Sequence, residues 1–170
     1  MGVDWKITAD NNSSTEFTNY FAFHWRDAGW HTGSLPWPYS WDQQPMDTLP
    51  VAANQAAEVS QNDSGSFASS ANDLIWGLSN SSQICLVRIH APTVVGPFGK
   101  SPTYRWVVTN APTDEPAKLD WKAFLKDLSW TTVKPAGKSI NVEGFGSKVL
   151  LSPTVRSKPS FEVDATITDS

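Results

Sequence analysis

Stretches in which apolar and polar residues alternate recur along most of this chain of 170 residues. A period of two is typical of strands that bury one face. In the last such stretch the apolar residues Phe161, Val163, Ala165 and Ile167 alternate with polar ones, so these four are predicted to point inward. The clearest predicted strands are residues 3–8, 17–25, 73–79, 83–90, 103–110 and 159–169.

The predicted strand at residues 17–25, FTNYFAFHW, carries apolar side chains on both of its faces. Phe21 and Phe23 share one face, while Tyr20 and His24 belong to the other. We therefore expect both faces to be covered, and the side toward His24 to be a pocket rather than open solvent.

One segment has the apolar spacing of a helix instead of a strand. Trp121, Phe124, Leu125 and Leu128 fall at i, i+3, i+4 and i+7, and Asp120 is suited to cap the first turn. This pattern predicts one short α-helix near residues 114–128 that covers the strands. The alternating stretches, together with 12 prolines and 10 glycines that favour turns, predict a mainly β or all-β fold. We expect a single domain over residues 1–170, built as an antiparallel β-sandwich or flattened barrel.

Residues 26–50 lose all periodicity, and their glycines and prolines predict a long loop without a regular ladder. This loop is rich in tryptophan, whose flat face packs against sugars and other amphiphilic ligands. The leading hypothesis is therefore a lectin-like protein that binds a small molecule or glycan. Arg88 and Arg105, on two predicted neighbouring strands, are candidates for holding a carboxylate or other polar end, with ordinary ion pairing as the favoured alternative. The remaining predicted ligand-binding residues are Tyr20, Trp25, Trp30, His31, Trp37, Tyr39 and Trp41.

Acid–base chemistry is the alternative, although the sequence favours a binding protein over an enzyme. His24, Asp27 and His31 lie close together in sequence and combine titratable rings with a carboxylate. In an aromatic-lined pocket they would suit a cofactor-independent cyclase or isomerase that acts on an apolar small molecule. A structural or oligomeric interaction protein is the second alternative, and both a monomer and a small homo-oligomer fit the sequence.

Composition narrows the range of partners. The net charge is −4 and no dense basic run occurs, which argues against nucleic acid. No stretch is long and apolar enough to predict a transmembrane helix, although exposed aromatic residues leave peripheral membrane contact open. The N-terminal residues lack a signal-peptide pattern, so we expect a cytoplasmic protein or one released without a cleaved signal. No motif predicts a metal site or a cofactor, and the lone Cys85, within an apolar run, is predicted to be a buried thiol.

Overall fold

The structure is a computed structural model. It describes residues 4–25, 29–31, 47–61, 71–90, 103–115, 118–134, 137–142, 145–155 and 160–169. At residues 23–25 and 29–31, and at a few others within these ranges, it describes the backbone alone.

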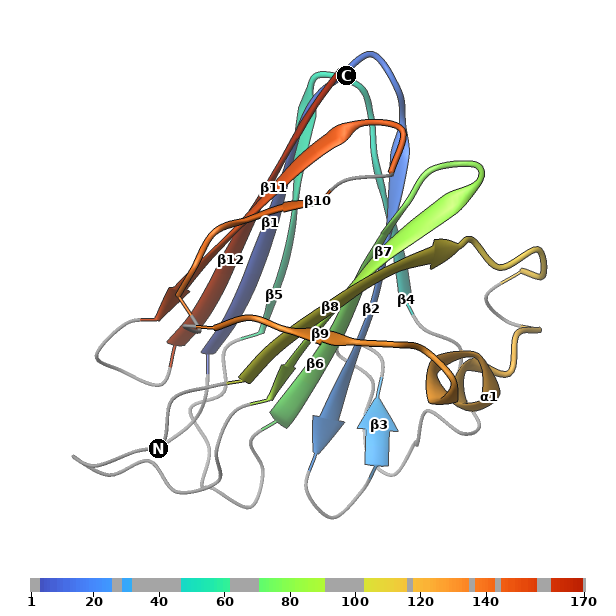
Figure 1. The fold of residues 1–170 in the computed structure, drawn as a ribbon, viewed down its shortest axis with the longest axis vertical. Coiled ribbons are helices and arrows are strands. Elements are labelled where there is room, and N and C mark those ends of the chain that lie inside the picture. The colour runs from blue at the N-terminus through green and yellow to red at the C-terminus, as the bar shows by residue number, and fades with distance from the viewer. Residues whose placement is uncertain are drawn as a thin grey trace.

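The described residues form twelve strands and one short helix (Figure 1). Their bounds are β1 (Asp4–Asn12), β2 (Phe17–Trp25), β3 (Gly29–His31), β4 (Asp47–Val51), β5 (Gln55–Gln61), β6 (Ala71–Ser79), β7 (Gln83–His90), β8 (Thr103–Asn110), α1 (Trp121–Lys126), β9 (Thr131–Thr132), β10 (Ile140–Val142), β11 (Lys148–Val155) and β12 (Ser160–Thr168).

The strands form two sheets that pack face to face as a β-sandwich, the first of the two predicted architectures. The five-stranded sheet has the order β10-β11-β12-β1-β5, and the seven-stranded sheet has the order β3-β2-β6-β7-β8-β9, with β4 also paired to β2. Every pair of strands is antiparallel among the described residues except β1 with β12, which is parallel. These two strands are the first and last in the chain, so no tight turn between them requires an antiparallel arrangement.

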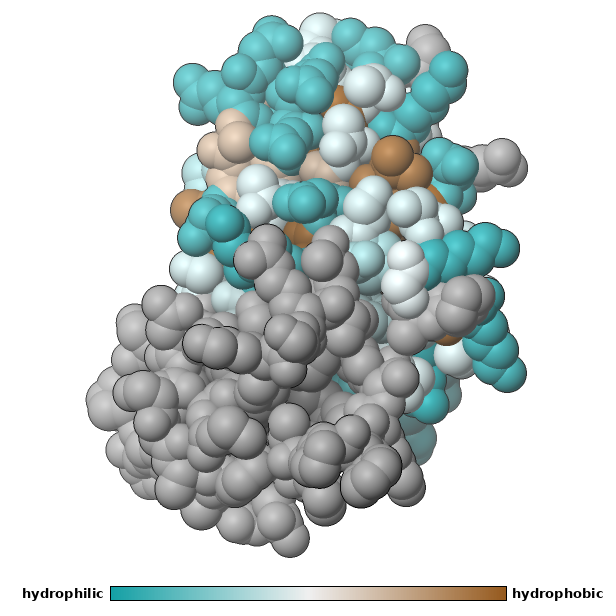
Figure 2. Space-filling model, turned by 90° about the vertical axis from the view of Figure 1, so that its left-hand side faces the viewer, coloured by the Kyte–Doolittle hydropathy of each residue, from teal (hydrophilic) through white to brown (hydrophobic). Residues whose placement is uncertain are grey.

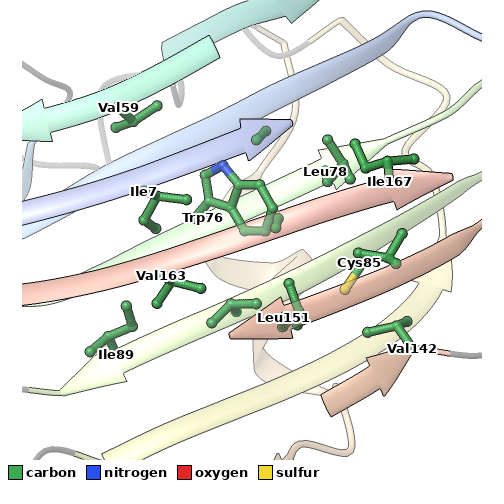
Figure 3. Packing of buried hydrophobic residues seen from close by; sticks show 14 of the residues in the cluster. Ile7, Val59, Trp76, Leu78, Cys85, Ile89, Val142, Leu151, Val163 and Ile167 are labelled. Carbon is green, nitrogen blue, oxygen red and sulfur yellow. The ribbon is translucent and has the colours of Figure 1, made fainter. Parts of the chain in front are cut away.

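The hydrophobic core lies between the two sheets. Figure 3 shows aliphatic side chains from both sheets pointing toward one another around Trp76. Within this core the Trp76 indole nitrogen donates a hydrogen bond to Asn19 Oδ1 at 3.1 Å, which satisfies a buried polar group. The free thiol of Cys85 is also buried here, as predicted, and burial raises its pKa to about 12. The thiol is therefore a packing element.

A second, smaller cluster covers part of the outer face of the seven-stranded sheet. Trp121 of α1 is 2% exposed, and its ring lies 5.6 Å from that of Tyr20 on β2. Asp120 caps the helix by accepting a hydrogen bond from the Ala123 amide at 3.1 Å. The predicted helix, its cap and its covering role are confirmed, but α1 is shorter than residues 114–128 and begins directly after the cap.

The alternating pattern located most of the strands. The predicted bounds at residues 17–25, 83–90 and 103–110 match β2, β7 and β8. β1, however, runs to Asn12 because Asn11 is buried and its side chain bonds the backbone carbonyl oxygens of Thr15 and Val51. A polar sequence here continues the strand, since these hydrogen bonds satisfy the buried amide.

The prediction that residues 26–50 contain no ladder is wrong in part. β3 and the first residues of β4 lie within this stretch, and both strands pair antiparallel with β2. Pro50 is tolerated in β4 because a strand with a partner on one side only need not donate on the other. β3 pairs with residues 23–25 of β2 and β4 with residues 17–21, so the two form one interrupted edge strand along β2.

The outer face of the five-stranded sheet is polar. Figure 2 shows this side as mostly hydrophilic, with only scattered hydrophobic residues outside the grey region. Lys6, Glu58, Lys148 and Asp164 are exposed here, and Leu150, 37% exposed, is the large apolar exception among the described residues. In the part of the chain that the structure describes, no helix has the length and apolarity needed to cross a membrane.

Candidate functional site

Strand register aligns four chemically active residues in one row across the seven-stranded sheet. His24 on β2 pairs with Asp73 on β6, Asp73 pairs with His90 on β7, and His90 pairs with Thr103 on β8. Paired residues on antiparallel strands share a face of the sheet. The row therefore occupies the outer face, near the end of the sheet where β2 and β7 finish and β6 and β8 begin.

The residues on the outer face of the seven-stranded sheet change from apolar to ionisable along β6 and β7. On β7 the buried Ile84 and Leu86 belong to the second cluster, which includes Trp121 of α1. The next residues on that face of β7 are Arg88 and His90. On β6 the buried Ile75 is followed at the strand end by Asp73. The apolar half of this face is covered by the helix, while the polar half carries ionisable side chains.

Asp73 is the centre of the polar half. Its side chain is only 6% exposed, and its two oxygens have different partners among the described residues. Oδ1 accepts a hydrogen bond from Arg88 Nε at 3.3 Å, and Oδ2 lies 3.0 Å from His90 Nδ1. A buried carboxylate with charged or polar partners on both oxygens holds those partners in fixed orientations.

Two arginines meet beside this carboxylate. Arg88 and Arg105 are direct partners in the register of β7 and β8. Together with His90 and Thr103 they line a cleft of about 240 Å³. Among the residues that the structure describes, Arg105 has no carboxylate partner, whereas Arg88 is paired with Asp73.

This cleft has the composition of an anion site. Two guanidinium groups supply planar forks of N–H donors, the Thr103 hydroxyl supplies one more donor, and the imidazole of His90 adds a titratable ring. Among the described residues, Asp73 is the carboxylate next to the two arginines, and it bonds Arg88. A small anion would suit the guanidinium of Arg105.

The structure brings some of the predicted ligand-binding residues together, while others lie elsewhere or outside the described residues. Arg88 and Arg105 are brought together as expected on neighbouring strands. The Tyr20 ring packs against Trp121, and burial raises the pKa of its hydroxyl. At least part of this ring is therefore packed in the second cluster. Trp25, Trp30 and His31 are placed by backbone alone, at the same end of the sheet as the cleft. Trp37, Tyr39 and Trp41 lie outside the described residues.

The residues expected to carry acid–base chemistry have a similar outcome. His24 is placed by backbone register directly opposite Asp73, and His31 opposite Phe23. Asp27 lies outside the described residues. The catalytic role of these three residues stays a prediction.

The sequence-based hypotheses did not include Asp73, His90 or Thr103. One signal was available: in each predicted strand these residues have the same parity as Ile75, Leu86 and Val107, and so share their face. In the sequence His90 lies far from His24 and His31. Sheet register, which local patterns do not encode, places it within two strands of His24.

The described residues contain no group of three or more histidine, cysteine, aspartate or glutamate side chains arranged to hold a metal ion. Comparison with known proteins finds no family model and no curated sequence that matches the chain. The function is therefore argued from the chemistry of the cleft itself.

Proposed function

We propose that this protein binds a small amphiphilic ligand or glycan through a carboxylate group, which occupies the cleft between Arg105 and His90. The observation that carries the proposal is the pairing of two arginines beside one buried aspartate. Among the described residues Asp73 engages Arg88 and no carboxylate pairs with Arg105, whose positive charge suits an acidic ligand.

The donors of the cleft suit a carboxylate. Arginine binds carboxylates through parallel N–H donors, and hydrogen bonds to charged groups contribute about 1.5–3 kcal/mol each. Arg105 is exposed, while Arg88 is partly buried and fixed by Asp73, so one arginine is free to adjust and the other is positioned in advance.

The volume of the cleft indicates how much of the ligand it encloses. Pockets for whole drug-sized ligands have volumes of roughly 300–1,000 Å³. A cleft of about 240 Å³ is smaller, so it fits the acid group and a few neighbouring atoms. The rest of the ligand would extend beyond it.

Aromatic residues at the same end of the sheet support an amphiphilic ligand. Trp30 on β3 pairs with His24, which pairs with Asp73 on the next strand. Trp25 ends β2 at this same edge. Tryptophan rings favour the apolar faces of sugars, aromatic rings and acyl chains.

The decisive experiment is calorimetric titration with matched ligand pairs that differ only in the acid group. Suitable pairs are decanoate with decanol, phenylacetate with phenylethanol, and glucuronate with glucose. We expect at least one acid to bind and its neutral analogue to bind about tenfold or more weakly, since a charge-assisted contact is lost. The pair that responds distinguishes an acyl, aromatic or sugar ligand.

Two variants separate a specific site from general electrostatic attraction. Arg105→Gln should weaken binding of the acid about tenfold or more, because it removes the unpaired guanidinium. Lys138→Gln removes the same charge from an exposed position outside the cleft and should leave binding unchanged. Equal binding of acid and neutral analogue, or equal effects of the two variants, would overturn the proposal.

A further inference from the structure

The His90 ring is held in one defined state by Asp73. An ionised carboxylate can only accept hydrogen bonds, so at 3.0 Å from Asp73 Oδ2 the Nδ1 atom of His90 must be the donor. In the neutral ring the other nitrogen, Nε2, is then the acceptor.

The carboxylate that performs this role is itself fixed. Asp73 is nearly buried and its second oxygen accepts from Arg88 Nε, whereas the His90 side chain is 49% exposed and lines the cleft. A buried orienting carboxylate and an exposed, tautomer-fixed imidazole are the two components of a general base.

We propose that His90 is an acid–base catalyst that moves a proton to and from a carbon next to a carbonyl group of the bound organic acid, with Asp73 as its positioning residue. This inference rests on the proposed function, because the acid must first bind beside Arg105. It assigns a keto–enol tautomerisation, a form of isomerisation, to residues that differ from His24, Asp27 and His31.

The proton transfer balances without a cofactor. Nε2 of His90 takes the proton as the C–H bond breaks, and the electron pair of that bond forms the C=C bond of the enol. The carbonyl π pair moves onto oxygen, where the guanidinium of Arg105 and the Thr103 hydroxyl can donate to the developing charge. The enolate oxygen then takes the proton from Nε2–H, which gives the enol and leaves Nε2 free again. In the reverse reaction, Nε2 removes the O–H proton and returns it to carbon.

The strands around His90 define the charged groups that act on this step. Asp73 faces it from β6, Arg88 lies on its own strand β7, and Arg105 and Thr103 face it from β8. His24 occupies the register position on the far side of Asp73. The arginines favour the enolate over the ketone, because negative charge moves onto oxygen in the reaction.

Phenylpyruvate is a suitable probe, because it joins a carboxylate, an acidic carbon next to a carbonyl and an aromatic ring. We would incubate the full chain with phenylpyruvate in D₂O and follow the loss of the C3 proton signal by NMR, with dissociation constants measured in parallel by calorimetry. The wild-type protein should accelerate exchange above the buffer rate. His90→Gln should lower the rate of protein-catalysed exchange about 100-fold, while the dissociation constant changes little.

Further variants distinguish the two levels of the proposal. Arg105→Gln should raise the dissociation constant and should also lower the exchange rate at saturating phenylpyruvate, because Arg105 both binds the carboxylate and donates to the developing enolate. Asp73→Asn should lower the exchange rate at saturation about tenfold and flatten its pH profile, because the ring loses its fixed tautomer. Lys138→Gln should match the wild type in both measurements. A folded state for each variant is checked by circular dichroism, and His90→Glu, which restores a base at this half-exposed position, should recover part of the exchange.

The outcomes are separable. Binding of phenylpyruvate without exchange above buffer would overturn the catalytic inference and leave the binding function in place. Exchange that persists in His90→Gln would do the same. Failure of every organic acid to bind would overturn the proposed function, and the inference with it.

Discussion

Arg88 and Arg105 are direct partners in the register of β7 and β8, so two positively charged residues lie opposite each other and line the same cleft. Like charges directly opposite each other destabilise an antiparallel pair. Asp73 relieves this repulsion for Arg88 but has no described contact with Arg105. The pair is therefore expected to cost stability, and this cost fits the proposed role of Arg105 in binding an anion.

Substitution of Arg105, which has no carboxylate partner among the described residues, should therefore not destabilise the fold. We expect Arg105→Gln to leave the free energy of unfolding unchanged or raise it by about 0.2–1 kcal/mol, because a like-charge pair is removed. Urea unfolding followed by tryptophan fluorescence measures this change. A loss of more than about 1 kcal/mol would show that Arg105 stabilises the sheet and would weaken its assignment to a ligand.

Asp73 should behave in the opposite way. Asp73→Asn removes the negative charge from a nearly buried side chain that bonds Arg88 and His90, so we expect a loss of about 1–3 kcal/mol in the free energy of unfolding. Asp164→Asn is the matched control, because Asp164 is exposed on the other sheet. It should change stability by less than about 0.5 kcal/mol. Equal effects of the two substitutions would contradict a central role for Asp73.

The sequence predicts the strands of this fold far better than their pairing. β2, β7 and β8 match to the residue because burial of alternate side chains is a local pattern that each strand carries by itself. β3 and β4 were missed because they are short edge segments interrupted by other residues, and their pairing with β2 depends on the partner strand.

The candidate site shows the same limit. Arg88 and Arg105 were predicted because they lie on two neighbouring predicted strands and their guanidinium groups can hold a carboxylate. Asp73 and His90 were not, because their contact joins two strand ends whose alignment is set by the whole of the β6–β7 register. A residue pair of this kind becomes visible only when the register is known.

Alkaline pH should destabilise the protein through two buried acids. Burial raises the pKa of Cys85 from 9.0 to about 12 and that of Tyr104 from 10.0 to about 12. Both groups hold their protons more tightly in the folded state, so their contribution to stability is complete below pH 9. It is lost as pH rises from 9 toward 12, because only the unfolded chain releases protons in that range.

The free energy of unfolding should fall with a slope that approaches about 1.4 kcal/mol per pH unit for each group. Urea unfolding at pH 7, 9, 10 and 11 measures this slope, and Cys85→Ala should reduce it between pH 9 and 10, where Tyr104 contributes least. A thiol reagent should also fail to modify Cys85 in the native protein at pH 8. Rapid modification without unfolding would contradict the burial of this residue.

Gly77 on β6 should be intolerant of even one added carbon. A Cβ atom at this position would lie 2.8 Å from Leu86 Cδ2 and 3.0 Å from Ile84 Cδ1. Both side chains are buried in the second cluster, with Trp121 of α1. Neither can move far in a packed cluster, so Gly77→Ala should lower the free energy of unfolding by about 1–3 kcal/mol. Gly137→Ala is the matched control, since its Cβ would meet nothing within 4 Å. We expect that control to be neutral or slightly stabilising, because alanine restricts the unfolded chain. If Gly77→Ala matched Gly137→Ala in urea unfolding, the helix would be packed more loosely on the sheet than the structure indicates.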